Sequence, residues 1–333
     1  MTRAAREAVA DGFARWANPS SPHAEGRAAR RLVEDARADV ATAYGWGQEV
    51  LLTGGASESL AIALGRSMVE RCFVSAVEHD AVLRASGAAS VMPVDAAGHV
   101  VLPDLAGPRA LVAVQWANSE TGVRQPIAAL AEAVHGAGHL LLVDAAQMPA
   151  GADPHVAEHA DFVALSAHKR GGPPGIGALL VRDLATLLPT GGQERGYRPG
   201  TENMPAAIGY AAALREAEPD HTALRAHLDD AVRRSGGIVV AEDSARHPAI
   251  GAYRMPGVPA AAQLIRFDSG GIAVSAGSAC ASGSLKPSHV LAALGWREEA
   301  AREVVRVSFG RTTTREEVDA FIAAWRGIAR GRA

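Results

Sequence analysis

Two polar clusters that could carry chemistry follow apolar runs of the sequence. Asp144-Ala145-Ala146-Gln147 follows Leu140–Val143, and Ser166-Ala167-His168-Lys169 follows Phe162–Leu165. A lysine amine can form a Schiff base with a carbonyl group, and a buried carboxylate can pair with a protonated pyridine nitrogen. A surface lysine and an aspartate at a strand end are the simpler interpretation, and these residues alone leave both open.

A glycine-rich stretch and a histidine offer further groups. Gly54-Gly55-Ala56-Ser57 follows the apolar Val50–Leu52 and precedes a helical pattern, so its backbone N–H groups could bind a phosphate. The same stretch could be an ordinary strand-to-helix turn with Ser57 as the N-cap. His79, which follows the apolar Phe73–Ala76, could stack on a cofactor ring or cap a helix.

The two cysteines differ in their surroundings. Cys280 lies within Ser275–Ser284, a run of small residues that predicts an exposed loop, whereas Cys72 has apolar neighbours. Because a reactive thiolate needs exposure, Cys280 is the candidate nucleophile. Lys169 and Lys286 are the only lysines in an arginine-rich chain. This bias favours a role in amine chemistry, which arginine cannot perform.

One motif is typical of metal sites. His155-Val156-Ala157-Glu158-His159 matches the H-x-x-E-H pattern of zinc peptidases letter for letter. The motif lies in a short connection after Asp153-Pro154 and immediately before a strand, rather than inside a long helix that would align both histidines on one metal. We therefore expect no metal site.

The polar clusters have to be positioned by an α/β fold. Apolar runs alternate with helical patterns as far as about residue 215, which indicates a mostly parallel sheet covered by helices. Ligands of such sheets bind beyond the carboxyl ends of the strands, and Asn118-Ser119-Glu120-Thr121-Gly122 is a third polar cluster at such an end. The expected strands are Phe73–Ala76, Leu111–Gln115, Leu140–Val143, Phe162–Leu165 and Gly177–Val181.

The pattern changes after about Glu216, where helices mix with short strands. We expect a large domain over residues 27–215, and a smaller α+β domain that combines residues 1–26 with 216–333. The expected elements of the small domain are helices at Thr222–Arg233, Ala261–Phe267 and Thr314–Ala329 and strands at Ile238–Val240 and Val304–Ser308.

Composition excludes several classes of protein. The chain has 333 residues, of which 48% are hydrophobic and 21% charged, as expected for a packed globular protein. A formal net charge of -3 provides no basic excess for nucleic acid or anionic lipid. No apolar run approaches the roughly 20 residues that span a bilayer, and residues 1–10 do not form a signal peptide. We expect a cytoplasmic protein with reduced cysteines, bound to neither membrane nor nucleic acid.

Together, these clusters resemble the cysteine desulfurases of the class V aminotransferase group. The matching stretches run in family order from Asn18-Pro19-Ser20-Ser21 to Phe309-Gly310-Arg311, and include SAHKRGGPPGIGALLVR, GGQERGYRPGTEN and SAGSACASGSLKPSHVLAALG. The resemblance implies a fold type I enzyme whose large domain binds pyridoxal 5'-phosphate. It also implies that L-cysteine is converted to L-alanine, with the sulfur passed to Cys280 as a persulfide. A sulfur-acceptor protein would then use it for iron–sulfur clusters, thio-cofactors or thiolated nucleosides.

The resemblance further implies a role for each matching residue. Lys169 is the Schiff-base lysine, Cys280 accepts the sulfur, and His79 stacks on the cofactor ring. Arg306 takes the substrate carboxylate. The other implied cofactor contacts are Ala56 and Ser57 in the glycine-rich stretch, Asn118, which also meets the substrate, Asp144 at the pyridine nitrogen, Gln147 at the ring hydroxyl, Ser166 and His168 at the phosphate, and Thr201 from the other subunit of a homodimer.

Two positions depart from the family pattern, and two other functions stay open. Ser119 replaces the second of two asparagines common in the family, and Leu60 stands where polar residues are usual. Another class V enzyme, such as a selenocysteine lyase or a small-molecule aminotransferase, is the nearest alternative. Cys280 in its small-residue loop argues against an aminotransferase. A catalytically weakened sulfur-relay scaffold is an alternative of a different class.

Overall fold

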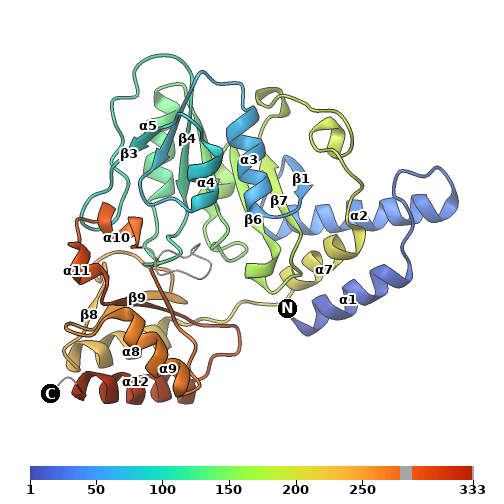
Figure 1. The fold of residues 1–333 in the computed structure, drawn as a ribbon. Helices are drawn as coiled ribbons and strands as arrows, with labels where there is room; N and C mark the ends of the chain where they lie inside the picture. Colours follow the sequence, from blue (N-terminus) through green and yellow to red (C-terminus); the bar gives the residue numbers. More distant parts are fainter. Residues whose placement is uncertain (278–286, 332–333) are drawn as a thin grey trace.

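The computed structural model describes residues 1–277 and 287–331 (Figure 1). Their strands form a seven-stranded sheet and a four-stranded sheet in separate parts of the molecule. Among the described residues, no helix is both long enough and apolar enough to cross a membrane.

The larger sheet has the strand order β1-β7-β6-β5-β4-β2-β3. Within it, β7 runs antiparallel to both of its neighbours, whereas the β6–β5, β5–β4, β4–β2 and β2–β3 pairs are parallel. The expected α/β class with a mostly parallel sheet is therefore confirmed. The strands are β1 (Glu49–Thr53), β2 (Arg71–Ser75), β3 (Ser90–Met92), β4 (Ala110–Gln115), β5 (Leu140–Asp144), β6 (Phe162–Ser166) and β7 (Gly177–Val181).

Helices cover both faces of this sheet because its strands are apolar on both sides. Side chains alternate between faces along a strand. In β4, Val112 and Val114 therefore pack with α2, α5 and α7, while Leu111 and Ala113 pack with α3 and α4. Such two-sided burial explains why these strands read as continuous apolar runs. The helices are α2 (Ala24–Ala43), α3 (Ala56–Arg66), α4 (Asp80–Ala85), α5 (Ile127–Gly136) and α7 (Met204–Leu214).

The smaller sheet is antiparallel, with the order β10-β11-β9-β8. Its apolar core includes Tyr253, Phe267, Phe321 and Trp325, and the Phe267 and Phe321 rings stack with centroids 4.8 Å apart. This part is the expected α+β unit, below the large sheet in Figure 1. Its elements are α8 (Thr222–Arg234), β8 (Ile238–Val239), β9 (Ile250–Arg254), α9 (Ala260–Ser269), β10 (Ser275–Ala276), α10 (His289–Ala293), α11 (Glu298–Ala301), β11 (Val304–Ser308) and α12 (Arg315–Arg330).

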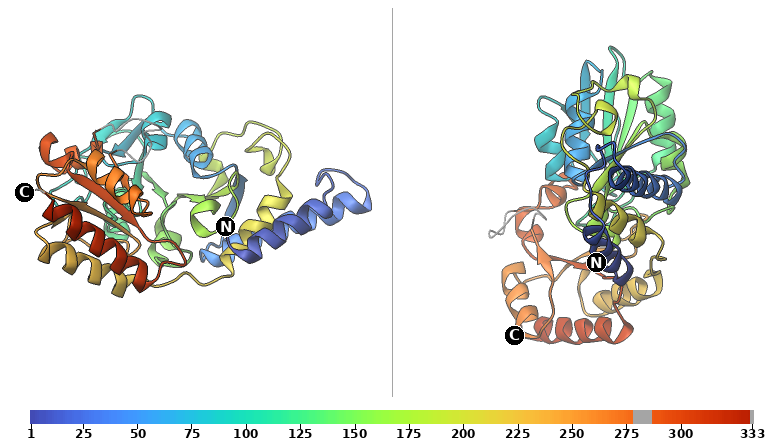
Figure 2. Two further views of the ribbon diagram at one scale, coloured as in Figure 1. Left: turned by 60° about the horizontal axis from the view of Figure 1, so that its bottom comes forward. Right: turned by 90° about the vertical axis from the view of Figure 1, so that its right-hand side faces the viewer.

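The N-terminal helix corrects one expected domain boundary. α1 (Arg3–Ala14) lies along α7 of the large domain, away from α8, α9 and α12 (Figures 1 and 2). The two helices approach so closely that a Cβ atom on Gly12 would lie 2.8 Å from the Pro205 Cα atom and 2.7 Å from Ile208. The assignment of residues 1–26 to the small domain is therefore wrong for α1, because its small-residue face is buried against α7.

A buried ion pair fastens the loop before α7 to the sheet. Arg37 on α2 contacts Glu194 at 2.6 Å, and their side chains are 9% and 0% exposed. Arg37 also donates to the Val50 carbonyl at 2.6 Å, and Glu194 accepts from the Leu52 amide at 2.9 Å. Burial lowers the pKa of Arg37, but the Glu194 and Glu34 carboxylates together more than offset this effect and raise the pKa above its ordinary value.

We predict that Glu194→Gln lowers the free energy of unfolding by roughly 3 kcal/mol, because it leaves the buried Arg37 charge with the half-exposed Glu34 as its remaining carboxylate partner. Urea denaturation followed by circular dichroism measures the loss. Glu7→Gln is the control, since Glu7 pairs with Arg3 on the surface, and it should cost less than about 1 kcal/mol. Equal losses in the two variants would contradict the role given to the buried pair.

Candidate active site

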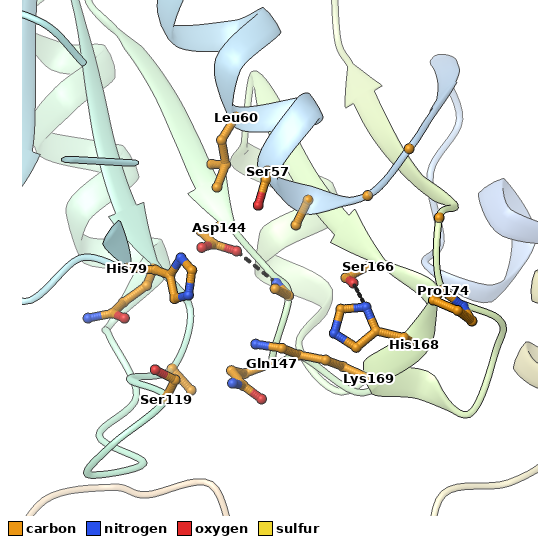
Figure 3. A pocket seen from close by; sticks show the side chains of 17 residues that line it. Ser57, Leu60, His79, Ser119, Asp144, Gln147, Ser166, His168, Lys169 and Pro174 are labelled. Atoms are coloured by element: carbon orange, nitrogen blue, oxygen red, sulfur yellow. Dashed lines mark hydrogen bonds between the residues drawn. The ribbon is translucent and has the colours of Figure 1, made fainter. Parts of the chain in front are cut away.

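A cavity of about 460 Å³ opens at the carboxyl ends of the parallel strands (Figure 3). The polar clusters that follow β2, β5 and β6 all contribute to its wall, as the sequence predicts. The expected residues in its lining are Ala56, Ser57, His79, Asp144, Gln147, Ser166, His168 and Lys169. Ser119 and Leu60, the two departures from the family pattern, also line it.

One end of the cavity is suited to an anion. α3 begins here, and its N-cap Gly55 (φ 141°) has no side chain to cap the first amide groups of the helix. The backbones of Gly55 and Gly177 pack together, and a Cβ atom on Gly177 would lie 2.7 Å from the Gly55 Cα atom. Ser166 Oγ and His168 Nδ1 are 2.9 Å apart on the same side. These groups offer N–H and O–H donors at a positive helix end.

The other end holds the amine and the carboxylate. Lys169 lies on the 3₁₀ turn Ala167–Arg170 that follows β6, and its side chain extends into the cavity beside Gln147 (Figure 3). Asp144 ends β5, is buried, and accepts a 2.9 Å hydrogen bond from the Ala146 amide. The structure thus brings together the groups that the Schiff-base interpretation requires.

Burial sets the charge of the histidines around Lys169. Burial lowers the pKa of His79, and the Lys169 charge lowers it further, although the Asp144 carboxylate opposes both effects. Burial and the Lys169 charge also lower the pKa of His168. Both imidazoles are therefore neutral near pH 7. His79 caps α4 through a 3.1 Å bond from the Ala81 amide, so its ring is held in place.

A buried carboxyl lies behind the cavity. Glu78 is fully buried, and burial together with the nearby Asp144 carboxylate raises its pKa well above the ordinary value. Its Oε1 atom accepts from the Gln115 amide at 2.9 Å, while the Gln115 side chain donates to the Val77 carbonyl at 2.7 Å. These bonds join the ends of β2 and β4.

Asn118 does not line the cavity wall, contrary to the expected direct contact. Its Oδ1 atom accepts from the amides of Glu120 and Thr121 at 2.9 and 2.8 Å, and its Nδ2 atom donates to the Val77 carbonyl at 3.1 Å. Because the side-chain amide is used in this way, Asn118 orders the turn that presents Ser119.

A second cavity of about 390 Å³ adjoins the first and shares Lys169, Ser119 and other wall residues with it. Arg306 on β11 lines this cavity, and its Nη1 atom donates to the Ser119 carbonyl at 3.2 Å. A guanidinium beside the amine suits a substrate carboxylate. Thr201 is exposed and is not part of the wall of either cavity.

Cys280 lies outside the described residues, but the chain on both sides of it is anchored at the cavity. Ser275 of β10 pairs with Arg306 of β11 on one side. On the other side, the Ser288 hydroxyl donates to the Glu120 carboxylate, and His289 Nε2 lies 2.9 Å from the Glu78 carbonyl oxygen. Cys280 is the fourth residue after Ala276 in the sequence. The described residues that flank Cys280 in the sequence are therefore held at the cavities.

Cys72 is a poor nucleophile by comparison. It lies on β2, where burial raises the pKa of its thiol to about 11. Because only the thiolate attacks, Cys72 is unsuited to this role, and the choice of Cys280 stays a prediction.

Comparisons with known proteins place the chain in a family. The aminotransferase class-V family matches residues 7–321. The chain belongs to this family. A cysteine desulfurase from Frankia sp. (strain EuIK1) is 38% identical, over 91% of this chain and 82% of the relative. Cysteine desulfurase IscS 1 of Archaeoglobus fulgidus is 32% identical, over 94% and 90%.

Among solved structures, the NifS-like protein from Rickettsia africae aligns with a TM-score of 0.88 at 28% identity, over 99% of this chain and 96% of that one. These matches confirm the resemblance to the cysteine desulfurases within the class V aminotransferases. They also confirm the fold that the sequence predicts.

Gln115 and His247 line the two cavities but were not among the expected site residues. Gln115 ends a predicted strand, so its position could have been noticed. His247 lines the second cavity from a loop of the small domain, and only the tertiary fold brings it there. Burial, with the nearby Arg170 charge, lowers the pKa of His247 to about 4.

The low pKa of His247 predicts acid sensitivity. Its folded pKa lies below the ordinary value of 6.5, so its contribution to stability is present above pH 6.5 and is lost as the pH falls toward 4. Between pH 7.5 and 5, this group should account for about 2 kcal/mol of the free energy of unfolding. His247→Asn keeps a short acceptor for the Ala249 amide but cannot titrate. Urea denaturation at both pH values should show that the free energy of unfolding falls less on acidification in this variant than in the wild type. An identical fall in the two proteins would contradict the assignment.

Proposed function

We propose that the cavity binds pyridoxal phosphate, with the ring between His79 and the Asp144 side of the wall. Three groups support this proposal. The uncapped start of α3 can bind the phosphate, the buried Asp144 carboxylate can pair with the pyridinium nitrogen, and the Lys169 amine can react with the aldehyde. The volume lies in the usual range for small-ligand sites. When bound, this cofactor provides an electron sink for negative charge at the substrate Cα atom.

The proposed roles follow from position in the wall. Ser57 and the Ala56 amide, with Ser166 and His168, hold the phosphate, and Thr201 of a second subunit completes its contacts. Gln147 donates to the ring hydroxyl. Asn118 contributes by ordering the turn that carries Ser119.

We propose that the reaction is the desulfuration of L-cysteine. The observation that carries this proposal is the anchoring of the Cys280 segment at both ends, beside Arg306 and beside Glu78 and Glu120. The described residues before and after Cys280 are thus held near the cavities that contain the Lys169 amine and the Arg306 guanidinium.

Each residue has a defined task in this reaction. Arg306 binds the substrate carboxylate, and the Lys169 amine takes the proton from Cα and can return one. The thiolate of Cys280 attacks the substrate sulfur, so an S–S bond forms as the Cβ–S bond breaks. The electron pair of the broken Cβ–S bond stays with Cβ, so Cβ is reduced and the two sulfur atoms together are oxidised. With protons balanced, the products are L-alanine and a persulfide on Cys280.

The persulfide is then passed to a sulfur-acceptor protein, for iron–sulfur clusters, thio-cofactors or thiolated nucleosides. Two alternative functions are tested by the same experiments. Alanine formation without Cys280 would favour a selenocysteine lyase or another class V enzyme. Failure to retain a cofactor would favour a sulfur-relay scaffold.

We predict that Lys169→Ala abolishes the visible absorption of the lysine-bound cofactor, because this amine lies in the cavity. Lys286→Ala is the matched control, since Lys286 is the other lysine of the chain, and its absorption should match the wild type. Absorption spectra of the purified proteins measure the lysine-bound cofactor. Cofactor content measured after denaturation shows whether a colourless variant has lost the cofactor or holds it without the bond to lysine. Loss of colour in Lys286→Ala alone would overturn the assignment of Lys169.

We predict a homodimer that needs Thr201 from each neighbouring subunit. Thr201 is exposed and lies outside the wall of its own cavity, so a partner has to bring it to a phosphate. Thr201→Val should weaken cofactor binding while the protein stays dimeric by light scattering. A monomer that binds pyridoxal phosphate as tightly as the wild-type protein would contradict the prediction.

Replacement of the proposed nucleophile tests the function itself. Cys280→Ser should keep the cofactor and still bind L-cysteine, yet form no alanine above background, because a hydroxyl cannot accept the sulfur as a thiolate does. Alanine is assayed with substrate in excess. Cys72→Ala, which removes the other thiol, should retain wild-type turnover. Wild-type alanine formation by Cys280→Ser would refute the desulfurase assignment.

A further inference from the structure

A cluster of metal-ligand side chains lies far from the cofactor cavity. His155, Glu158 and His159 belong to α6 (Pro154–His159), a short helix that the sequence pattern did not predict. One ligand atom from each side chain lies within 4.8 Å of the other two. α6 leads into the start of β6, whereas the cavity lies at the end of that strand, roughly 13 Å further along. The cluster is therefore separate from the catalytic groups.

The spacing of the ligand atoms is close to that of a tetrahedral metal site. Glu158 Oε2 lies 3.5 Å from His155 Nδ1 and 3.6 Å from His159 Nε2. Around a tetrahedral zinc ion with bonds of about 2.0–2.1 Å, neighbouring ligand atoms lie about 3.4 Å apart. The two imidazole rings are nearly parallel, with an interplanar angle of 7° and centroids 5.8 Å apart. Small side-chain movements would complete the coordination.

The backbone of α6 is fixed at its start. The Asp153 side chain accepts from the His155 amide at 3.2 Å. Asp153 is itself held by the Trp116 indole N–H at 2.9 Å. Val156, between the two histidines, is buried in the core beneath the large sheet. The first turn therefore cannot rotate freely.

The end of α6 is fixed as well. The Arg182 guanidinium donates to the carbonyls of Ala157, Glu158 and Ala160, each at 2.9 Å. The same guanidinium stacks over the Trp46 ring, 5.2 Å from its centroid. A six-residue helix held at both ends presents His155 and His159, one turn apart, on one face. The site is therefore preorganised although the helix is short.

We propose that His155, Glu158 and His159 bind a divalent transition metal ion of the Zn²⁺ type. Two imidazoles and one carboxylate form a ligand set that zinc uses in proteins, and three protein ligands leave a coordination position for water or for a group from another molecule. This revises the expectation of no metal site, which assumed that only a long helix could align the two histidines. Because Glu158 lies between the imidazole nitrogens, it acts as a ligand.

Titration of the purified enzyme with Co²⁺ tests the proposal, because tetrahedral Co²⁺ has visible d–d bands and thiolate ligands add charge-transfer bands in the near ultraviolet. We expect one equivalent to bind with d–d bands alone, and Zn²⁺ to displace it. His155→Ala, His159→Ala and Glu158→Gln should each weaken binding at least about tenfold, with unchanged circular dichroism and cofactor absorption.

His99→Ala is the matched control. His99 Nδ1 lies 3.9 Å from the Asp95 carboxylate, so these two residues form a histidine–carboxylate pair like part of the cluster but do not belong to it. This variant should therefore bind Co²⁺ like the wild type. Two results would overturn the proposal. One is unchanged affinity in all three cluster variants, and the other is a thiolate band showing that Co²⁺ binds at cysteine. Neither result bears on the desulfurase reaction, whose residues lie at the other end of β6.

Discussion

The carboxyl ends of β2, β4, β5 and β6 meet at one edge of the large sheet, and the site depends on this alignment. Parallel strands deliver the residues that follow them to the same place, so Glu78-His79, Asp144 and Lys169 come together from distant parts of the sequence. Their proximity has electrostatic consequences. The raised pKa of Glu78 and the lowered pKa of His79 both follow from burial beside charged neighbours.

The small domain contributes side chains that contact the residues at the edge of the large sheet. Arg306 reaches Ser119 from β11, and Ser288 and His289 reach Glu120 and Glu78 from the start of α10. These contacts cross between the two parts of the molecule and hold the chain on both sides of Cys280. The proposed chemistry therefore needs both parts: the large sheet provides the amine and cofactor groups, and the small domain provides the Arg306 guanidinium for the substrate carboxylate and the segment that contains Cys280.

The sequence predicted most of the site because the signals are local. A polar cluster directly after an apolar run marks a strand end, which was sufficient for Asp144, Gln147, Ser166, His168 and Lys169. Residues placed only by tertiary contacts could not be found in this way. His247 reaches the second cavity from a loop, and the Arg37–Glu194 pair joins residues far apart in the chain.

Two sequence expectations failed for physical reasons. α1 was grouped with the small domain, but its packing against α7 depends on a close approach at Gly12 that no periodicity reveals. The histidine motif was assigned to a short connection because it follows Asp153-Pro154 and comes immediately before a strand. Asp153 and Arg182 stabilise that short helix from outside its own sequence.

The central claim is that sulfur leaves L-cysteine for the thiol of Cys280, and peptide mapping by mass spectrometry after a single turnover tests it most directly. Wild-type enzyme is mixed with limiting L-cysteine and quenched by alkylation, and the alanine is counted alongside each modified cysteine peptide. The predicted result is a persulfide on Cys280 in the same amount as alanine, with Cys72 unmodified. Alanine formed with the extra sulfur on Cys72, or with sulfide released while Cys280 stays unmodified at every quench time, would contradict it.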